Sequence, residues 1–405
     1  MSSLEMPWGP RQSMIRLDYA VIKYEVDDEP VFRGGFQASD APPAGGKLSV
    51  ERVEATPEQL YQLQKEESVK GVAPIMPLLL IEPEESEADA SGEGSTWGIS
   101  AIGAETSPFD GSGVTVAVLD TGIDASHPAF SAVAVIEKDF TGEGDGDRNG
   151  HGTHCAGTIF GADVDGLRIG VARNVDRALV GKVLGGQGGS TEGILDAVTW
   201  AVSEGAQVIS MSLGIDFPGM VESLRGRGVP SRAATSMALA AYRDNVRVFD
   251  TIADLARRSD RFGRGAVIVA ASGNESHRQG GDSEQGYVVD AAPPATAEGI
   301  LSVGALGLQD SGEYSIASFS NANPNLSGPG VDVISAAMGG GLRALSGTSM
   351  ATPHVAGVAA LWAEKLSQDD AFTVEHLSAM LVGRVEKTGL AFPDAGGGMA
   401  FAPQE

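Results

Sequence analysis

The chain has 405 residues, of which 42% are hydrophobic and 55 are glycine, and its formal net charge is −26. The length suits a large catalytic domain with a smaller partner, and the hydrophobic fraction is enough for a substantial core. The acidic balance argues against nucleic acid and an anionic membrane surface as partners, because phosphate binding needs clustered Lys and Arg. The single cysteine, Cys155, excludes an intrachain disulfide.

The N-terminus lacks the pattern of a secretory leader. Residues 1–20 carry charged side chains and no continuous apolar core. The apolar run at residues 77–81 is too short to span a bilayer. We therefore expect a cytoplasmic protein without membrane contact, and export by a route other than Sec is the alternative.

Residues 1–95 predict a small α+β domain. Residues 16–26 are rich in β-branched and aromatic side chains, which is typical of a strand. Thr56 as N-cap, Pro57 in the first turn and Gln59 in the capping-box position predict the start of a helix. Residues 69–81 return to an extended apolar pattern. The acidic stretch 82–95 contains no basic residue and reads as a linker that cannot order itself.

Residues 96–405 alternate between buried strands and helices. The predicted elements are a helix over 192–204 and strands over 114–119, 178–184, 208–213 and 266–271. Near-continuous apolar strands between amphipathic helices indicate an α/β fold with a parallel sheet covered on both faces. Functional residues in such folds gather at the carboxyl ends of the strands.

Four motifs follow these elements. Asp120 ends the first strand, and His151 lies between two glycines that leave room for a substrate backbone. Asn274 follows the strand over 266–271, and Ser349 precedes a helix-forming run whose N-terminus favours negative charge beside the hydroxyl. Taken singly, these residues could be a strand cap, a core histidine and a turn asparagine. Together they supply the base and the carboxylate that a serine nucleophile requires.

The motifs resemble those of the subtilisin-type serine peptidases, the subtilases, over about residues 97–405. The resemblance implies a subtilisin-like three-layer fold in which Asp120 orients His151, and His151 acts as general base and then acid. It further implies that Ser349 is the nucleophile and that Asn274 shares the oxyanion hole with the Ser349 N–H. The expected function is a serine endopeptidase that cleaves extended polypeptides through an acyl-enzyme.

Residues 1–95 have the position and layout of the subtilase propeptide, whose C-terminal tail occupies the cleft. We therefore expect the chain's own prodomain to be a partner, with self-processing in the linker. A permanent, uncut accessory domain is the alternative. Two other functions stay open, namely a dedicated maturation protease for one peptide precursor and a non-catalytic peptide-binding scaffold.

Two stretches of small residues match the family's substrate-binding edges, where a peptide adds as a strand. These are Gly188, Gly189, Ser190, Ser212, Leu213 and Gly214. The primary pocket is expected between 212–214 and a second wall that bears no fixed charge, made of Ala271, Ser272 and Gly273. A large apolar residue is the expected occupant, although Glu275 at the rim would admit a basic one. Pro294 lies where the family has a cis proline.

No cofactor is expected for the chemistry, but a structural Ca²⁺ is one interpretation of residues 142–149. There Asp145 and Asp147 have the spacing that converges oxygens on a hard cation, as in some subtilases. A solvated acidic turn is an equal alternative. His154 and Cys155 would leave a tetrahedral metal site half empty. Cys155 is placed as in the proteinase K-like branch and reads as a small buried residue.

Residues 215–264 form an insertion longer than the family core requires. Apolar residues at helical spacing predict a surface helix packed on the core: Leu239, Tyr242, Val246, Phe249, Ile252 and Leu255. The opposite face carries arginines and is alternatively a recognition surface for an acidic substrate or partner.

Overall fold

The computed structural model describes residues 17–26, 46–88, 90–258, 265–279 and 285–405. The prediction that the N-terminus lacks a leader falls mostly outside these ranges, as does the end of the predicted insertion. No helix within the described ranges is long and apolar enough to cross a membrane.

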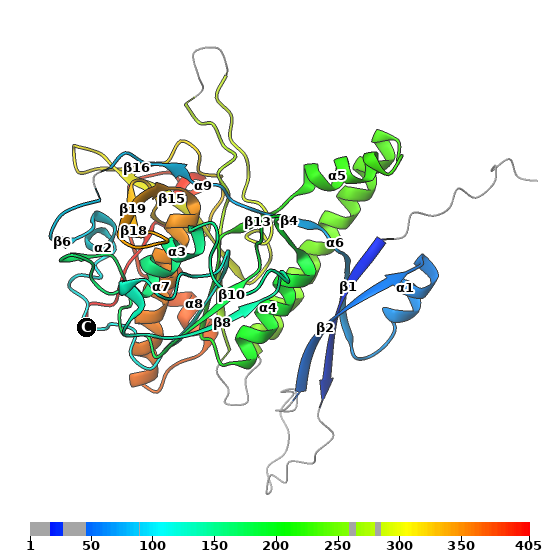
Figure 1. The fold of residues 1–405 in the computed structure, drawn as a ribbon, viewed down its shortest axis with the longest axis horizontal. Coiled ribbons are helices and arrows are strands. Elements are labelled where there is room, and N and C mark those ends of the chain that lie inside the picture. Colours follow the sequence, from blue (N-terminus) through cyan, green and yellow to red (C-terminus); the bar gives the residue numbers. More distant parts are fainter. Residues whose placement is uncertain (1–16, 27–45, 89, 259–264, 280–284) are drawn as a thin grey trace, which may run out of the picture.

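The N-terminal unit is a three-stranded antiparallel sheet with one helix, α1 (Pro57–Leu63). The Thr56 hydroxyl accepts from the Gln59 N–H and the Gln59 side chain accepts from the Thr56 N–H, so the predicted capping box is confirmed. The strand order is β2 (Gly46–Ala55), β1 (Leu17–Val26) and β3 (Val69–Pro74). This blue unit lies at one side of the molecule in Figure 1.

A ten-stranded sheet forms the centre of the described structure. All neighbouring strands from β21 to β8 are parallel, as predicted. The central strands β14, β12 and β7 are buried on both faces, whereas β8 at the edge of the sheet is partly exposed. β20 and β16 are antiparallel additions to β21 and β15. Along the sheet the strands are β20 (Val385–Glu386), β21 (Met399–Ala400), β17 (Leu326–Pro329), β15 (Ile300–Leu308), β14 (Val267–Ala271), β12 (Val208–Met211), β7 (Thr115–Asp120), β10 (Arg177–Lys182) and β8 (Ala134–Asp139), with β16 (Tyr314–Ile316) beside β15.

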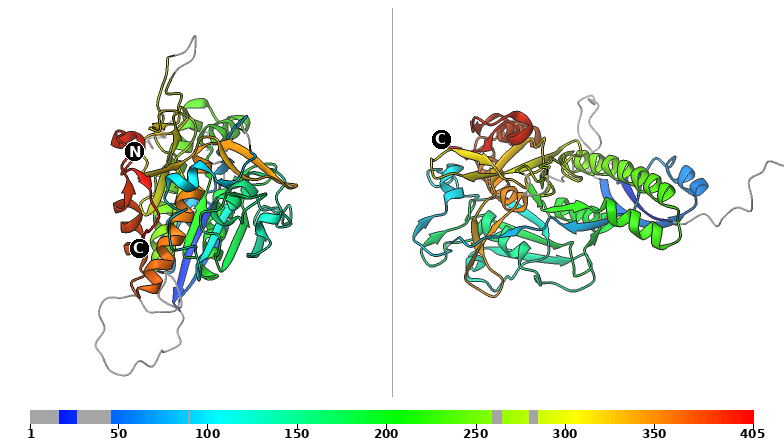
Figure 2. Two further views of the ribbon diagram at one scale, coloured as in Figure 1. Left: turned by 90° about the vertical axis from the view of Figure 1, so that its left-hand side faces the viewer. Right: turned by 90° about the horizontal axis from the view of Figure 1, so that it is seen from above.

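Helices cover the sheet on both faces. Alternate residues of β7 point to opposite faces, with Val116 and Val118 in one buried cluster and Ala117 and Leu119 in the other. The first cluster lies under α2 (Trp97–Ala101), α3 (His151–Phe160), α7 (Thr348–Gln368) and α8 (Val374–Gly383). The second lies under α4 (Thr191–Ser203), α5 (Phe217–Gly226) and α6 (Ser231–Arg258). The two helix groups lie apart in Figures 1 and 2, and the three-layer fold is confirmed.

Short elements complete the described chain. They are η1 (Pro128–Phe130), α9 (Phe392–Ala395), β4 (Pro77–Leu80), β5 (Glu84–Glu85), β6 (Gly94–Ser95), β9 (Leu167–Arg168), β11 (Gly189–Ser190), β13 (Leu213–Ile215), β18 (Val333–Ala336) and β19 (Leu342–Ser346). The peptide bond between Pro293 and Pro294 is cis.

The N-terminal sheet packs on α4 and α6. Its residues Ala20, Ile22 and Ala73 belong to the same buried cluster as α6, and the buried Asn245 of α6 donates to the Pro74 carbonyl over 2.8 Å. The predicted apolar face of α6 is wrong at Leu239, which is 59% exposed. Phe249 and Ile252 are buried as predicted, and alanines make up most of the rest of the face, because small side chains let the helix approach its neighbours closely. The alanines are Ala234, Ala238, Ala241, Ala253 and Ala256.

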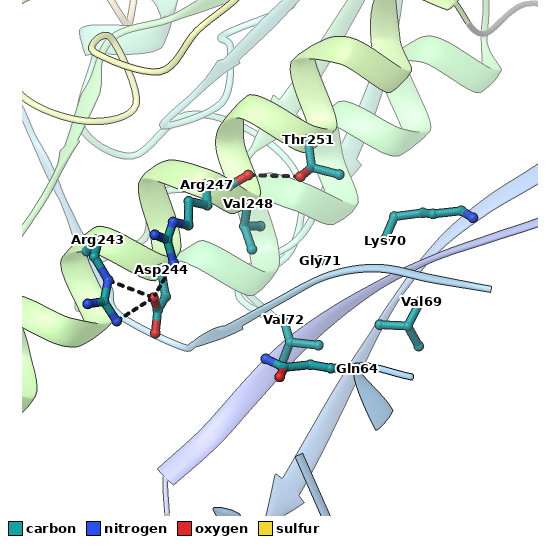
Figure 3. Close-up of a pocket in the computed structure, with 10 residues that line it drawn as sticks. All are labelled: Gln64, Val69, Lys70, Gly71, Val72, Arg243, Asp244, Arg247, Val248 and Thr251. Carbon is teal, nitrogen blue, oxygen red and sulfur yellow. Dashed lines mark hydrogen bonds and ion pairs between the residues drawn. The ribbon is translucent and has the colours of Figure 1, made fainter. Parts of the chain in front are cut away.

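A pocket of about 400 Å³ lies between α6 and β3, and Figure 3 shows the residues around it. Arg243 and Arg247 reach it from α6, but both pair with Asp244 on the same helix. Their charges are thus partly neutralised within the helix. A recognition surface for an acidic substrate or partner on this face stays a prediction.

The chain then crosses the molecule from β3 to α2, as the blue segment through β4 in Figure 1 shows. The prediction that residues 82–95 cannot order themselves is wrong for the described part of this stretch. Glu84 and Glu85 pair with β19, and Gly94 and Ser95 pair with β9. The stretch buries little apolar surface of its own, but exposed strand edges of the large domain supply its hydrogen bonds.

Candidate active site

The carboxyl ends of three neighbouring strands bring the predicted motifs together. Asp120 ends β7, Ser212 follows β12, and Ser272 follows β14. These strands are adjacent and parallel in the order β14, β12, β7, so their ends meet at one edge of the sheet. Helices α3 and α7 begin beside this edge and carry His151 and Ser349.

Asp120 and His151 form a buried pair. His151 Nδ1 lies 2.7 Å from Asp120 Oδ1, and both side chains are only 1% exposed. The Thr121 N–H donates to the same carboxylate oxygen over 2.7 Å. With Nδ1–H held by the carboxylate, Nε2 is the atom that can accept a proton. Nε2 is buried and has no hydrogen-bond partner among the described residues.

The pair sets the protonation of the imidazole. Burial by itself lowers the pKa of His151, but the adjacent Asp120 carboxylate raises it, and the net pKa lies well above the ordinary histidine value. Burial raises the pKa of the neighbouring Cys155 thiol. Cys155 is therefore a buried neutral thiol, which argues against a nucleophilic role.

Ser349 lies in the first turn of α7 and is fully buried. Its backbone carbonyl would ordinarily accept from the residue four positions later, but that residue is Pro353, which has no N–H. Ser212 Oγ and Cys155 Sγ approach this carbonyl instead, each at 3.4 Å. The interruption of the helix thus places two side chains against the backbone of the candidate nucleophile.

The orientation of the Asn274 amide is fixed by its neighbours. Its Oδ1 accepts from both the backbone N–H and the hydroxyl of Thr348, at 2.9 and 2.8 Å. Nδ2 is therefore the end that faces the cleft, where it donates to the Glu82 carbonyl over 2.9 Å. This is the arrangement that an oxyanion donor needs.

The predicted edges hold a strand of the chain itself. β4 pairs antiparallel with β11 on one side, where Gly189 faces Leu78, and with β13 on the other, where Gly214 faces Leu79. Ile81 follows β4 and is 5% exposed. A Cβ placed on Gly214 would lie 3.8 Å from Ile81 Cγ1, so Gly214 borders the space that Ile81 fills.

The same strand continues past the predicted nucleophile, Ser349. The Ser349 hydroxyl donates to the Ile81 carbonyl over 3.2 Å rather than to His151. Beyond Pro83, β5 pairs with β19, and Glu85 makes an ion pair with Arg343 at 2.7 Å. We call residues 77–85 the cleft segment. It contacts two of the four predicted catalytic groups directly, Ser349 and Asn274.

The acidic loop does not fit a calcium site. Asp145 is exposed, and the two carboxylate oxygens of Asp147 accept five hydrogen bonds from backbone and hydroxyl donors. A cation at Asp147 would have to displace these donors. Within the described ranges, the group of three side chains that could hold a metal is Asp120, His151 and Cys155, which includes neither loop residue. Ca²⁺ binding there stays an unsupported prediction.

His154 is a structural histidine. Its Nε2 lies 3.0 Å from the Val333 carbonyl, and burial lowers its pKa to about 3. The ring is therefore neutral and tied to β18, and its hydrogen bond leaves no reason to assign it to a metal.

A parallel α/β sheet that gathers a carboxylate, a histidine and a serine at one edge defines a serine hydrolase. Residues 111–398 match the Subtilase family, and the chain belongs to that family. It is a subtilisin-like serine peptidase.

Named relatives agree with this family. The "Intracellular serine protease" of Paenibacillus polymyxa is 33% identical over 72% of this chain and 79% of its own length. The "Major intracellular serine protease" of Bacillus subtilis is 32% identical over 73% of this chain and 83% of its own. The "Alkaline serine exoprotease A" of Vibrio alginolyticus is 32% identical over 81% of this chain and 54% of its own.

Sequence reasoning missed several parts of the site. It did not identify the Thr348 contacts that orient Asn274, nor Thr121 and Thr153 as partners of Asp147. These threonines lie inside the motifs named above. Their spacing does not show whether a threonine side chain makes a hydrogen bond or only fills space. The cleft segment was expected only as a propeptide tail, without its register.

Proposed function

We propose that the protein is a serine endopeptidase in which Ser349 Oγ attacks the carbonyl carbon of the scissile bond. His151 Nε2 takes the hydroxyl proton and then delivers it to the leaving amine. The carbonyl oxygen becomes an oxyanion that Asn274 Nδ2 and the Ser349 N–H stabilise. Water then attacks the acyl-enzyme with His151 again as base. The observation that carries this proposal is the buried Asp120–His151 pair beside Ser349, with an Asn274 amide whose donor end faces the cleft.

The substrate we propose is an extended polypeptide. The antiparallel pairing of β4 between β11 and β13 supports this, because main-chain hydrogen bonds to two edges accept any extended chain. The buried position of Ile81 beside Gly214 supports an apolar residue before the scissile bond. The Glu275 carboxylate accepts from Asn321 over 2.6 Å and keeps its negative charge, so a basic residue there stays the alternative.

We also propose that residues 1–95 act as a built-in inhibitor through the cleft segment. In a productive complex, the nucleophile and the oxyanion donor act on one carbonyl group. Here Ser349 contacts the Ile81 carbonyl, whereas Asn274 contacts the Glu82 carbonyl. The two catalytic groups engage consecutive residues, so neither carbonyl is held for attack. This mismatch supports a bound but uncleaved segment.

Self-processing then requires a shift of the segment or cleavage by a second copy. The residue after Glu82 is Pro83, whose ring fixes the backbone and whose nitrogen carries no hydrogen. A shift that places the Ile81 carbonyl against Asn274 would expose the ordinary Ile81–Glu82 bond. We propose this bond, or one further along the linker, as the processing site.

Hydrolysis of unfolded casein and the intact mass of the protein test both proposals. Wild-type protein should degrade casein and lose a fragment that ends between residues 81 and 98, whereas Ser349→Ala should do neither. If Ser349→Ala degrades casein as fast as the wild type, the proposed nucleophile is wrong. If the wild type degrades casein but keeps its full mass, the endopeptidase stands and the N-terminal unit is a permanent accessory.

A non-catalytic peptide-binding scaffold remains the alternative class, but it would not need the buried Asp120–His151 pair. A dedicated maturation protease differs only in selectivity, and a peptide library distinguishes it because such an enzyme cuts few members. Two relatives are named as intracellular serine proteases, and on that basis we propose an intracellular location.

A further inference from the structure

Asp147 lies in the loop between β8 and α3, four residues before His151. Its Oδ1 accepts from the Thr121 hydroxyl and from the Asn149 and Gly150 N–H groups, each at 2.9 Å. Its Oδ2 accepts from the Thr153 N–H at 2.9 Å and from the Thr153 hydroxyl at 2.6 Å. One carboxylate thus ties together the loop, the end of β7 and the first turn of α3.

We propose that Asp147 is a positioning residue that holds the Asp120 carboxylate and the His151 imidazole in their catalytic relation. The inference rests on the catalytic roles proposed above. Asp147 touches neither catalytic side chain, and it acts through Thr121 and through the helix that carries His151.

The first connection runs to Asp120. Thr121 follows Asp120 directly, and its N–H donates to Asp120 Oδ1 over 2.7 Å. The Thr121 hydroxyl donates to Asp147 and accepts from the Gly152 N–H, both at 2.9 Å. A single hydroxyl therefore joins the residue beside the catalytic carboxylate to the helix of the catalytic histidine.

The second connection runs to His151, the first residue of α3. The N-cap of this helix is Gly150 at φ 96°, which has no side chain to cap the free N–H groups. Other residues take its place. Asn149 accepts from the His151 N–H at 3.2 Å, Thr121 accepts from Gly152, and Asp147 accepts from Thr153. The negative charge of Asp147 also lies at the positive end of the helix dipole.

Close backbone contacts make this unit intolerant of displacement. A Cβ on Gly152 would lie 2.1 Å from the Gly122 carbonyl oxygen, and a Cβ on Gly122 would lie 2.7 Å from the Gly146 carbonyl oxygen. The turn after β7, the acidic loop and the helix start thus touch along their backbones. Loss of the Asp147 hydrogen bonds should move His151 relative to Asp120, and small misplacements of this kind cost up to about 100-fold in rate.

Asp147→Asn tests the proposal, because the amide keeps the size of the side chain but cannot accept from Thr153 and Thr121 together. Asp139→Asn is the matched control. Asp139 starts the same loop and accepts from the Thr141 N–H, the Thr141 hydroxyl and the Gly144 N–H, without contacting β7 or α3 by a hydrogen bond of its side chain. Both variants lose a carboxylate that orders the loop. Of the two, only Asp147 is hydrogen-bonded to the residues beside Asp120 and His151.

We expect Asp147→Asn to lower kcat on a peptide nitroanilide by about 10- to 100-fold with KM changed by less than about 2-fold. We further expect the low-field proton resonance of His151 Nδ1–H to move or broaden in Asp147→Asn and to stay in place in Asp139→Asn. Thr121→Val should reproduce both effects. Thr121→Ser keeps the hydroxyl and should retain the wild-type kcat and the wild-type resonance. The threonine variants decide the matter if Asp147→Asn does not fold.

Three results would overturn the proposal: an unchanged kcat and resonance in Asp147→Asn, equal losses in the two Asn variants, or equal behaviour of Thr121→Val and Thr121→Ser. The test of Asp147 can fail or succeed independently of the test of the proposed function. If wild-type protein hydrolyses nothing, the catalytic roles fail, while the resonance still reports whether Asp147 positions His151.

Discussion

At the scale of single residues, the Asp120 carboxylate determines the pH range in which His151 can act as a base. Burial lowers the pKa of the imidazole, but Asp120 raises it, and the net value is well above the ordinary one. Because the neutral imidazole is the base, kcat/KM should fall as the pH drops through this raised pKa. We therefore expect an acidic limb above pH ~6.5, the ordinary histidine value, in a pH profile of kcat/KM.

Asp120→Asn should move this limb to lower pH, because the charge that raises the pKa is gone. The rate should also fall by about 10⁴, the loss known for this substitution in a serine protease of another fold. A limb at the same pH in Asp120→Asn would contradict the assignment of the raised pKa to Asp120.

Asn274 is expected to act mainly on the transition state. In subtilisin, a member of this family, removal of one oxyanion donor costs on the order of 10²–10³ in kcat. We expect a loss of similar size for Asn274→Ala with little change in KM, measured by steady-state kinetics.

Asn274→Asp separates catalysis from structure. The aspartate keeps an acceptor for the N–H and hydroxyl of Thr348 but lacks the donor that faces the cleft. Both variants should lose kcat, and both lose the hydrogen bond to the Glu82 carbonyl, but only Asn274→Ala also loses the acceptor for Thr348. Wild-type kcat in Asn274→Asp would rule out Asn274 as the oxyanion donor.

At the scale of elements, the cleft segment is anchored by two buried apolar side chains, Leu78 and Ile81. Ile81 is 5% exposed, whereas Leu79 on the same segment is 49% exposed. A carboxylate at residue 81 would be buried without a partner, which is costly, while one at residue 79 would stay in water. Ile81→Asp should therefore release the segment and raise the initial rate of peptide hydrolysis by at least about tenfold, which corresponds to about 1.4 kcal/mol of lost binding.

Leu79→Asp is the control and should leave the initial rate near that of the wild type. An equal increase in both variants would show that charge alone loosens the segment. No increase in Ile81→Asp would show that the segment does not limit access to the cleft.

Local signals predicted some elements well. The capping box at Thr56 and Gln59 is contained in four consecutive residues, and the parallel strands were recognised because burial on both faces leaves a continuous apolar run. The linker was misjudged because its order comes from pairing with β19 and β9, far away in sequence. The face of α6 was misjudged at Leu239, because alanines share the buried face with Phe249 and Ile252, and a pattern of large residues does not detect them.

The site was predictable where its residues belong to local motifs, and not where they depend on distant contacts. Asp120, His151, Asn274 and Ser349 follow their strands or begin their helices, so topology and motif identify them together. The sequence left Asp147 open between a calcium ligand and a solvated turn, because an acidic spacing shows the oxygens but not the donors that reach them. Four of its five hydrogen bonds come from residues within six positions of it, and the fold brings in the fifth, from Thr121.

At the scale of the whole molecule, the N-terminal unit and the large domain share one core. The buried cluster on the α4 and α6 face of the sheet continues into β1 and β3, and Leu78 of the cleft segment belongs to it. A single cut in the linker would therefore leave the N-terminal unit docked. If the unit inhibits as proposed, inhibition should persist after cleavage until the unit is displaced or degraded. Release of the unit, rather than the cut itself, would then activate the enzyme.

The proposed function depends above all on Ser349 as the activated nucleophile of a serine endopeptidase. The most direct measurement is to treat full-length protein with a fluorophosphonate and to locate the adduct by peptide mass spectrometry, with heat-denatured protein and Ser349→Ala as controls. We expect one adduct, on Ser349, that is absent from both controls and forms faster in Ile81→Asp. An adduct on another residue, or none in either the wild type or Ile81→Asp, would contradict it.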